Sequence, residues 1–161
     1  MRMTPGVRFL KQRKIAFEAR EYALKVKGAE YAAEALDWPL AAMVKTLVVC
    51  LESKGGPGDF VLCCMPGDRE LSLKKLARAA GTRGARMSTT EEAEKLTGYL
   101  VGGISPFGAR KPTPIWIHDS IPTLERIGIN GGRRGFIVFL SPEAVLKMPA
   151  ARVAELATEP A

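Results

Sequence analysis

The chain has 161 residues, of which 47% are apolar and 25% are charged, and its formal net charge is +7. This length suits one domain whose core is large enough to fold without disulfides or a structural metal. No apolar run approaches the roughly 20 residues of a membrane span, and the first residues lack the apolar core of a secretory signal. We therefore expect one domain over residues 1–161, located in the cytoplasm and not at a membrane.

The positive charge is concentrated in two stretches. Residues 1–27 carry eight Lys or Arg against two Glu, and residues 69–86 carry six against one. A basic surface suits a polyanion, and RNA is the commonest one in the cytoplasm. The same excess also serves solubility, so composition alone leaves both interpretations open.

The first third of the chain predicts a helix, a strand and a second helix. Thr4-Pro5 is typical of a helix start, with a hydroxyl N-cap and proline at the first helical position, and this helix is expected to end near Gln12. Residues 15–22 alternate between apolar and polar, which predicts a half-buried strand. The alanine-rich residues 29–36 predict a helix.

The middle of the chain predicts a hairpin between helical segments. Residues 40–44 suit one more helical turn, and the apolar runs 46–51 and 60–65 predict an antiparallel hairpin. Ser72 and Gly81 are placed to cap and stop a helix over 73–80. A short strand is expected at 86–87, followed by an acidic helix capped by Thr89 or Thr90.

The last third predicts strands at 115–118, 126–129 and 135–140. Helices are expected beyond Ser141-Pro142, through 145–146 and 153–156. Since strands dominate the middle and helices flank them, the fold class is α+β with a mixed or antiparallel sheet.

The three cysteines are Cys50, Cys63 and Cys64. Their odd number and the lack of Cys-x-x-Cys spacing argue against a disulfide framework or a zinc site. All three lie in apolar runs, which favours buried packing residues. Neighbours on a strand face opposite ways, so Cys63 and Cys64 are expected on opposite faces.

Residues 97–108 contain four glycines, which is costly unless the backbone needs unusual angles or something approaches it closely. One interpretation is a strand and tight turn whose N–H groups bind an oxyanion, a phosphate or a ribose. The other is an ordinary turn between strands.

Two ionisable residues are candidates for chemistry. Lys45 directly precedes a buried strand, so its ammonium could be solvated or could hold an anion at a rim or pocket. His118 stands beside Asp119 without a second histidine, which argues against a metal and leaves a general base as the alternative. No nucleotide-binding glycine motif and no Gly-x-Ser-x-Gly motif is present.

Three segments together resemble the YbaK family, the free-standing deacylases related to the editing domain of bacterial prolyl-tRNA synthetase. They are Met-Val-Lys-Thr-Leu-Val-Val at 43–49, Thr-Gly-Tyr-Leu-Val-Gly-Gly-Ile-Ser-Pro at 97–106 and Gly-Gly-Arg-Arg-Gly at 131–135. Thr4-Pro5, Tyr22 and the helix at 71–77 also fit, so the resemblance covers the chain in order.

The resemblance implies a mixed, strongly curved, barrel-like sheet flanked by helices. It also implies trans-editing hydrolysis of mischarged aminoacyl-tRNA, most typically Cys-tRNA(Pro), without a cofactor or metal. The expected partners are tRNA(Pro) and, for delivery, prolyl-tRNA synthetase, rather than DNA or a membrane. A cysteinyl substrate would attack its own ester with its thiol, so the enzyme would need no cysteine of its own.

The family's functional residues are carried over to matching positions. The resemblance implies catalytic roles for Lys45, Gly102 and Gly103. Substrate-binding roles fall on Tyr22, Tyr31, Ile104, Ser105 and Pro106. In close relatives an acidic residue follows the last glycine-rich turn, and here Ile137 or its neighbours stand in its place.

Several alternatives stay open. The same reaction could act on Ala- or Ser-charged tRNA, or Ser105 could be a covalent nucleophile, although no histidine lies at a fixed sequence distance to activate it. The missing acid also suits a non-catalytic tRNA- or synthetase-binding module. A third possibility is a pocket for a small thiol or nucleotide.

Overall fold

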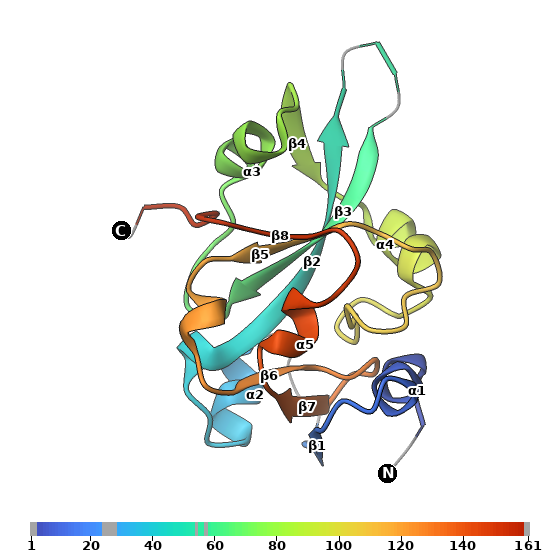
Figure 1. The fold of residues 1–161 in the computed structure, drawn as a ribbon, viewed down its shortest axis with the longest axis vertical. Coiled ribbons are helices and arrows are strands. Elements are labelled where there is room, and N and C mark those ends of the chain that lie inside the picture. The colour runs from blue at the N-terminus through green and yellow to red at the C-terminus, as the bar shows by residue number, and fades with distance from the viewer. Residues whose placement is uncertain (1–2, 24–28, 54, 57, 160–161) are drawn as a thin grey trace.

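The structure is a computed structural model that describes residues 3–23, 29–53, 55–56 and 58–159. Its eight strands form one mixed sheet in the order β1–β7–β6–β2–β3–β5–β8, and β4 pairs with β2 off this path (Figure 1). The strands are β1 (Glu18–Glu21), β2 (Met43–Glu52), β3 (Asp59–Pro66), β4 (Gly84–Met87), β5 (Ile115–His118), β6 (Ile127–Asn130), β7 (Phe136–Leu140) and β8 (Ala151–Ala154).

Helices cover the sheet on its two faces. They are α1 (Pro5–Gln12), α2 (Ala29–Ala35), α3 (Leu73–Ala80), α4 (Thr90–Thr97) and α5 (Glu143–Leu146), with 3-10 turns η1 (Leu40–Ala42) and η2 (Ile121–Thr123). Among the described residues, no helix is long and apolar enough to cross a membrane.

The long β2–β3 hairpin forms the centre of the sheet. The two strands pair antiparallel from Val44 opposite Pro66 to Leu51 opposite Asp59, as the apolar runs predict. Parallel pairs add β6 beside β2 and β5 beside β3. The mixed sheet with flanking helices confirms the predicted fold class. In the predicted turn between the strands, Lys54 and Pro57 lie outside the described residues.

Alternation along the strands divides the core. Val44 and Val48 of β2 pack on the face that α1 and α4 cover, whereas Val49 and Leu51 pack on the opposite face with Leu76 of α3. A third cluster lies between α2 and the far side of β7. Cys63 and Cys64 fall in different clusters, so the cysteines are packing residues on opposite faces, as expected.

Helix caps connect the helices to the sheet. The Thr4 hydroxyl accepts a hydrogen bond from the Val7 N–H at 3.0 Å and donates one to the Gly131 carbonyl at 2.5 Å. The cap of α1 therefore also holds the β6–β7 turn. Ser72 caps α3, and Gly81 ends it in a left-handed conformation, both as predicted.

One predicted element was wrong. Residues 151–154 form strand β8, and not the helix predicted at 153–156, because they pair with the edge of β5. Of the two interpretations of residues 97–108, the structure shows a turn and no strand at 99–101. Gly98 ends α4 with φ of 79°, and the Gly103 N–H closes the turn on the Leu100 carbonyl at 2.8 Å.

Two boundaries also move. The strand predicted at 15–22 is shorter, since β1 pairs with β7 only over Glu18–Glu21. The helical turn expected at 40–44 ends at Ala42, because Met43 already pairs with Gly128 of β6.

Candidate active site

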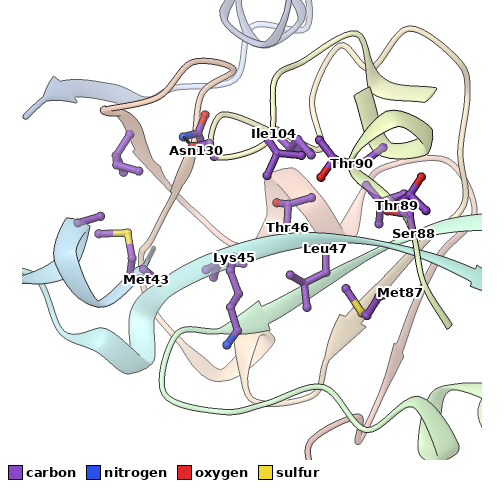
Figure 2. A pocket seen from close by; sticks show the side chains of 18 of the residues that line it. Met43, Lys45, Thr46, Leu47, Met87, Ser88, Thr89, Thr90, Ile104 and Asn130 are labelled. Atoms are coloured by element: carbon purple, nitrogen blue, oxygen red, sulfur yellow. Dashed lines mark hydrogen bonds between the residues drawn. The ribbon is translucent and has the colours of Figure 1, made fainter. Parts of the chain in front are cut away.

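A gap in the sheet creates the candidate site. Strand β2 pairs with β6 only at Met43 and Val44, and with β4 only from Val49 onward. Residues 45–48 therefore have no neighbouring strand on this edge within the described part of the chain. A pocket of about 310 Å³ fills the gap, enclosed by β2, α2, the segment 87–90, the loop around Gly102, and the ends of β6 and β7 (Figure 2).

The open edge of β2 presents backbone groups to the pocket. The Val48 carbonyl accepts a hydrogen bond from the Ser88 N–H at 3.1 Å, which shows that the backbone groups of Val48 face this edge. Because this orientation alternates residue by residue, the N–H and C=O of Thr46 face the same way. The pairing with β6 ends at Val44 and the pairing with β4 begins at Val49, so neither strand pairs with Thr46. An N–H without a neighbouring strand at the wall of a pocket suits a carbonyl oxygen or an oxyanion.

Lys45 borders the pocket with its stem, and its ammonium reaches a carboxylate. Its side chain leaves β2 on the face opposite to that of Thr46 (Figure 2). Its Nζ lies 3.5 Å from Oε1 of Glu70, and the two side chains are 22% and 83% exposed. Ion pairs this exposed contribute about 0.2–1 kcal/mol, so a substrate anion can replace Glu70 at little cost.

The two central glycines have different surroundings. Gly102 lines the pocket with φ of 95°, whereas Gly103 does not line it. The Gly103 N–H is already bonded to Leu100, and a Cβ at Gly103 would lie 2.7 Å from the Arg134 nitrogen. Gly102 thus offers accessible backbone, and Gly103 allows the loop to pack closely on residues 133–134.

Asn130 is a pocket residue that sequence reasoning missed. Its Oδ1 accepts hydrogen bonds from the N–H groups of Gly132 at 2.7 Å and Arg133 at 3.0 Å. Its Nδ2 donates to the carbonyls of Arg133 at 3.0 Å and Gly102 at 3.3 Å. Asn130 therefore ties the β6–β7 turn to the glycine loop. Asn-Gly-Gly indicates a turn, but no local signal shows that this turn faces a pocket.

The predicted aromatic pair lies at one side of the pocket. Tyr22 lines it, and burial raises the pKa of the Tyr22 phenol, which keeps it protonated at neutral pH. Tyr31 lies behind, with its ring 5.7 Å from that of Tyr22 and its hydroxyl donating to the Ala23 carbonyl at 3.1 Å. Tyr31 thus supports Tyr22 and does not line the pocket.

The remaining predicted residues divide between pocket and core. Ile104 lines the pocket. Ser105 is fully buried, and its hydroxyl accepts a hydrogen bond from the Phe107 N–H at 3.1 Å. Pro106 is buried beside it. Ser105 is therefore placed as a loop support, without the access that a covalent nucleophile needs.

The pocket has few ionisable groups. Lys45 and Tyr22 are the ionisable side chains among the described residues that line it, without a carboxylate, an imidazole or a thiol. Ile137 lines it and is only 4% exposed; it is one of the neighbouring residues that stand where the resemblance implies an acid, and it is apolar. The arrangement can bind and orient a ligand and stabilise negative charge, but it lacks a general base.

The other candidate groups lie elsewhere. His118 is buried on β5, and its Nδ1 accepts a hydrogen bond from the Ser120 N–H at 3.1 Å. Burial raises the pKa of the Cys64 thiol to about 12 and raises that of Cys63 as well, so both stay protonated and unreactive. No group of His, Cys, Asp or Glu among the described residues is arranged to hold a metal ion.

Comparison with known proteins identifies the family. The model of the aminoacyl-tRNA editing domain matches residues 24–148, which is most of the chain. The chain belongs to the aminoacyl-tRNA editing domain family. Its mixed sheet is thus the editing-domain fold, and the resemblance drawn from the three sequence segments is confirmed.

Relatives of this editing domain include free-standing and synthetase-borne forms. The chain is 34% identical over 158 residues to a protein of Enterococcus faecalis provisionally named Cys-tRNA(Pro)/Cys-tRNA(Cys) deacylase EbsC, covering 97% of this chain and 94% of that protein. It is 34% identical over 115 residues to a proline–tRNA ligase of Sulfurihydrogenibium, covering 71% of this chain and 19% of the ligase. A solved structure provisionally described as a trans-editing enzyme for prolyl tRNA synthetase matches with a TM-score of 0.83 and 26% identity, over 98% of this chain and all of that one.

Proposed function

We propose that this editing domain is an aminoacyl-tRNA deacylase that acts in trans on mischarged tRNA(Pro), with cysteine as its main substrate. The observation that carries the proposal is a pocket whose described lining combines Lys45 with the unpaired backbone edge of β2 and contains no general base. An aminoacyl ester is already activated, so orientation and oxyanion stabilisation can suffice for its cleavage. The name of the Enterococcus faecalis relative supports the same substrate.

A cysteinyl ester supplies the nucleophile that the pocket lacks. In the proposed step, the substrate sulfur forms a bond to the ester carbonyl carbon while the bond from that carbon to the ribose oxygen breaks. The thiol proton ends on the ribose oxygen, so tRNA leaves with a free hydroxyl. The cyclic thioester that remains is then hydrolysed to cysteine. The protein thiols take no part, consistent with their burial.

Each pocket residue then has a role. We assign charge stabilisation to Lys45, which would exchange Glu70 for the substrate oxyanion or a phosphate. We assign hydrogen-bond donation to the backbone of Thr46 and Gly102, and contact with the terminal adenosine or the amino acid to Tyr22 and Ile104. Tyr31, Gly103, Ser105 and Pro106 would hold these groups in position from behind.

The proposal includes the surroundings of the reaction. The partner is charged tRNA(Pro) in the cytoplasm, and prolyl-tRNA synthetase is the partner we propose for delivery. Neither DNA nor a membrane has a role in this account. Phosphate contacts give affinity without sequence choice, so selection of the tRNA by a bound synthetase fits a pocket that encloses only the ester end.

The direct test is a substrate panel. The purified chain is incubated with tRNA(Pro) charged with cysteine, alanine, serine or proline, and release of each amino acid is followed. We expect rapid loss of cysteine and stable Pro-tRNA(Pro). Loss of alanine or serine instead would keep the reaction but overturn the cysteine assignment.

A second candidate function is a binding module without catalysis. The observation that favours it is the apolar Ile137 in the pocket lining, since Ile137 or its neighbours stand where the resemblance implies an acid. Charged tRNA bound without release of any amino acid in the same panel would support this candidate and overturn the deacylase.

A further inference from the structure

The second basic stretch of the sequence, residues 69–86, contains cations of two kinds. Three of them have a partner in the structure. Lys75 lies 2.6 Å from Glu155 Oε2, and Arg86 lies 2.8 Å from Glu92 Oε1. Arg69 donates to the Thr158 carbonyl at 3.0 Å. These three cations hold the C-terminal segment and the start of α4 in place, which accounts for them structurally.

The other three cations have no such partner. Lys74, Arg78 and Arg83 are exposed, and within the described part of the chain none lies in an ion pair. All three line one groove between α3 and β4, together with Thr82 and Gly84. Lys74 and Arg78 are four residues apart on α3, where like charges repel and destabilise a helix slightly. A ligand of opposite charge would offset that cost.

The groove is connected to the pocket by strand β4. The strand begins at Gly84, which lines the groove, and ends at Met87, which lines the pocket. Three residue steps along a strand span about 10 Å. One strand of a stacked nucleic acid advances about 3.4 Å per phosphate, so about three nucleotides cover the distance. Figure 1 shows α3 and β4 side by side at the same end of the molecule as the hairpin tip.

We propose that Lys74, Arg78 and Arg83 form a docking surface for the phosphates of the acceptor end of tRNA. The ester then lies in the pocket at the gap of β2, and the nucleotides before the terminal adenosine pass along β4 to the groove. The inference rests on the proposed deacylase function for the position of the ester. The proposed surface would contact the phosphates of a tRNA, which a small ester lacks.

The test compares two triple variants that remove equal charge. Lys74→Gln/Arg78→Gln/Arg83→Gln empties the groove of cations, and Arg8→Gln/Lys11→Gln/Lys14→Gln removes three exposed cations from α1 and its end. Affinity for uncharged tRNA(Pro) transcript is measured by fluorescence anisotropy at about 50 and 200 mM salt. Deacylation is measured on Cys-tRNA(Pro) and on the cysteinyl ester of adenosine alone.

The groove variant is expected to weaken tRNA binding and to flatten its salt dependence. Three lost contacts to a single strand reduce the slope of log affinity against log salt by about two. Between the two salt concentrations, the affinity of the wild type for tRNA should therefore fall by a factor about 15 times larger than that of the variant. KM for Cys-tRNA(Pro) rises, and turnover of the adenosine ester is unchanged. The α1 variant keeps affinity and slope near those of the wild type.

The outcomes separate this surface from the proposed function. Wild-type affinity and slope in the groove variant, or an equal loss in both variants, would overturn the docking surface even if cysteine is released. Absence of ester cleavage by the wild type would contradict the deacylase, whereas a selective loss of tRNA affinity in the groove variant would still support the surface.

Discussion

At the scale of single residues, Asn130 connects two segments that are far apart in the sequence. One amide group satisfies the N–H groups of the β6–β7 turn and also holds the Gly102 carbonyl. The oxygen holds the turn through the Gly132 and Arg133 N–H groups. The nitrogen holds the Arg133 carbonyl of the same turn and also positions the glycine loop beside the pocket through the Gly102 carbonyl.

Replacing Asn130 tests its contacts with the turn and with the loop. Asn130→Ala leaves the turn N–H groups unpaired, and we expect a loss of about 2 kcal/mol in the free energy of unfolding together with slower deacylation. Asn130→Asp keeps an acceptor for the turn N–H groups but loses the Nδ2 donor to the Arg133 and Gly102 carbonyls, so it should lose less stability than Asn130→Ala and still slow the reaction. Urea unfolding and single-turnover rates measure the two effects. Normal rates in Asn130→Asp would show that the loop needs no such tether.

Glu70 gives a second prediction, because its carboxylate forms an ion pair with the Lys45 ammonium in the free protein. An exposed pair contributes about 0.2–1 kcal/mol, so Glu70→Gln should raise kcat/KM by up to about fivefold with little change in stability. Steady-state kinetics on Cys-tRNA(Pro) measure this change. A lower kcat/KM would mean that Glu70 orients Lys45 rather than competing with the substrate.

Single residues could be predicted from sequence where their signal was local. Lys45, Gly102, Tyr22 and Ile104 stood in recognisable segments, and all four line the pocket. The backbone of Thr46 could not be predicted, because its free edge exists only where β6 and β4 diverge. Gly103 lies in a recognised motif, but its tight packing against residues 133–134 depends on the fold.

At the scale of elements, the start of α4 forms one wall of the pocket. Ser88, Thr89 and Thr90 line it, and Thr89 caps the helix in a capping box with Glu92. The N-cap Ser72 plays the same part for α3, at a distance from the pocket lining. The two helices thus offer a matched pair of caps.

Removing each cap separates stability from catalysis. Thr89→Ala and Ser72→Ala each lose one N-cap hydrogen bond, which costs about 1 kcal/mol of folding stability. Only Thr89→Ala should also slow deacylation, by several-fold, because it loosens the pocket wall. Thermal unfolding and kcat/KM are measured on both variants. Equal activity loss in the two would attribute the effect to general destabilisation.

Elements were predictable where local patterns and caps agreed. α1, α3, α4 and the β2–β3 hairpin follow from caps, periodicity and apolar runs. β8 was misjudged because its four residues, half of them exposed, carry no alternation of their own and take strand form only by pairing with β5. The sequence left a strand or a turn open at 97–108, because the apolar run there includes Tyr99, which is 4% exposed and packs inward from a loop.

At the scale of the whole molecule, ion pairs connect elements beyond the sheet hydrogen bonds. Arg86 on β4 holds Glu92 on α4, and the guanidinium together with the Thr89 N–H lowers the pKa of the Glu92 carboxyl from 4.5 to about 2. A carboxyl with a depressed folded-state pKa stabilises the fold above its unfolded value. That contribution is lost as the pH falls from about 4.5 toward 2.

The pH dependence of unfolding tests this pair. Between about pH 6 and pH 3 the urea midpoint of the wild type should fall, and part of that fall should be absent in Arg86→Gln. Arg83→Gln removes the same charge from an arginine that pairs with no carboxylate of the described residues, and it should retain the full dependence. Parallel curves for all three proteins would show that the pair does not link folding to protonation.

At the scale of the whole molecule, the fold class could be predicted because the segments that resemble the family cover the chain in order. The sequence could not show that β6 and β4 leave a gap along β2. That gap depends on pairing between residues far apart in the chain, such as Met43 with Gly128.

The central claim, that the gap in β2 is a deacylation site dependent on Lys45, is tested most directly by cysteine release from Cys-tRNA(Pro). The wild type is compared with Lys45→Ala and with Lys95→Ala, which removes an exposed lysine of α4. We predict that Lys45→Ala loses about 10²-fold or more in kcat/KM while remaining folded, and that Lys95→Ala matches the wild type. Wild-type turnover by folded Lys45→Ala, or no release of cysteine by any of the three proteins, would contradict the account.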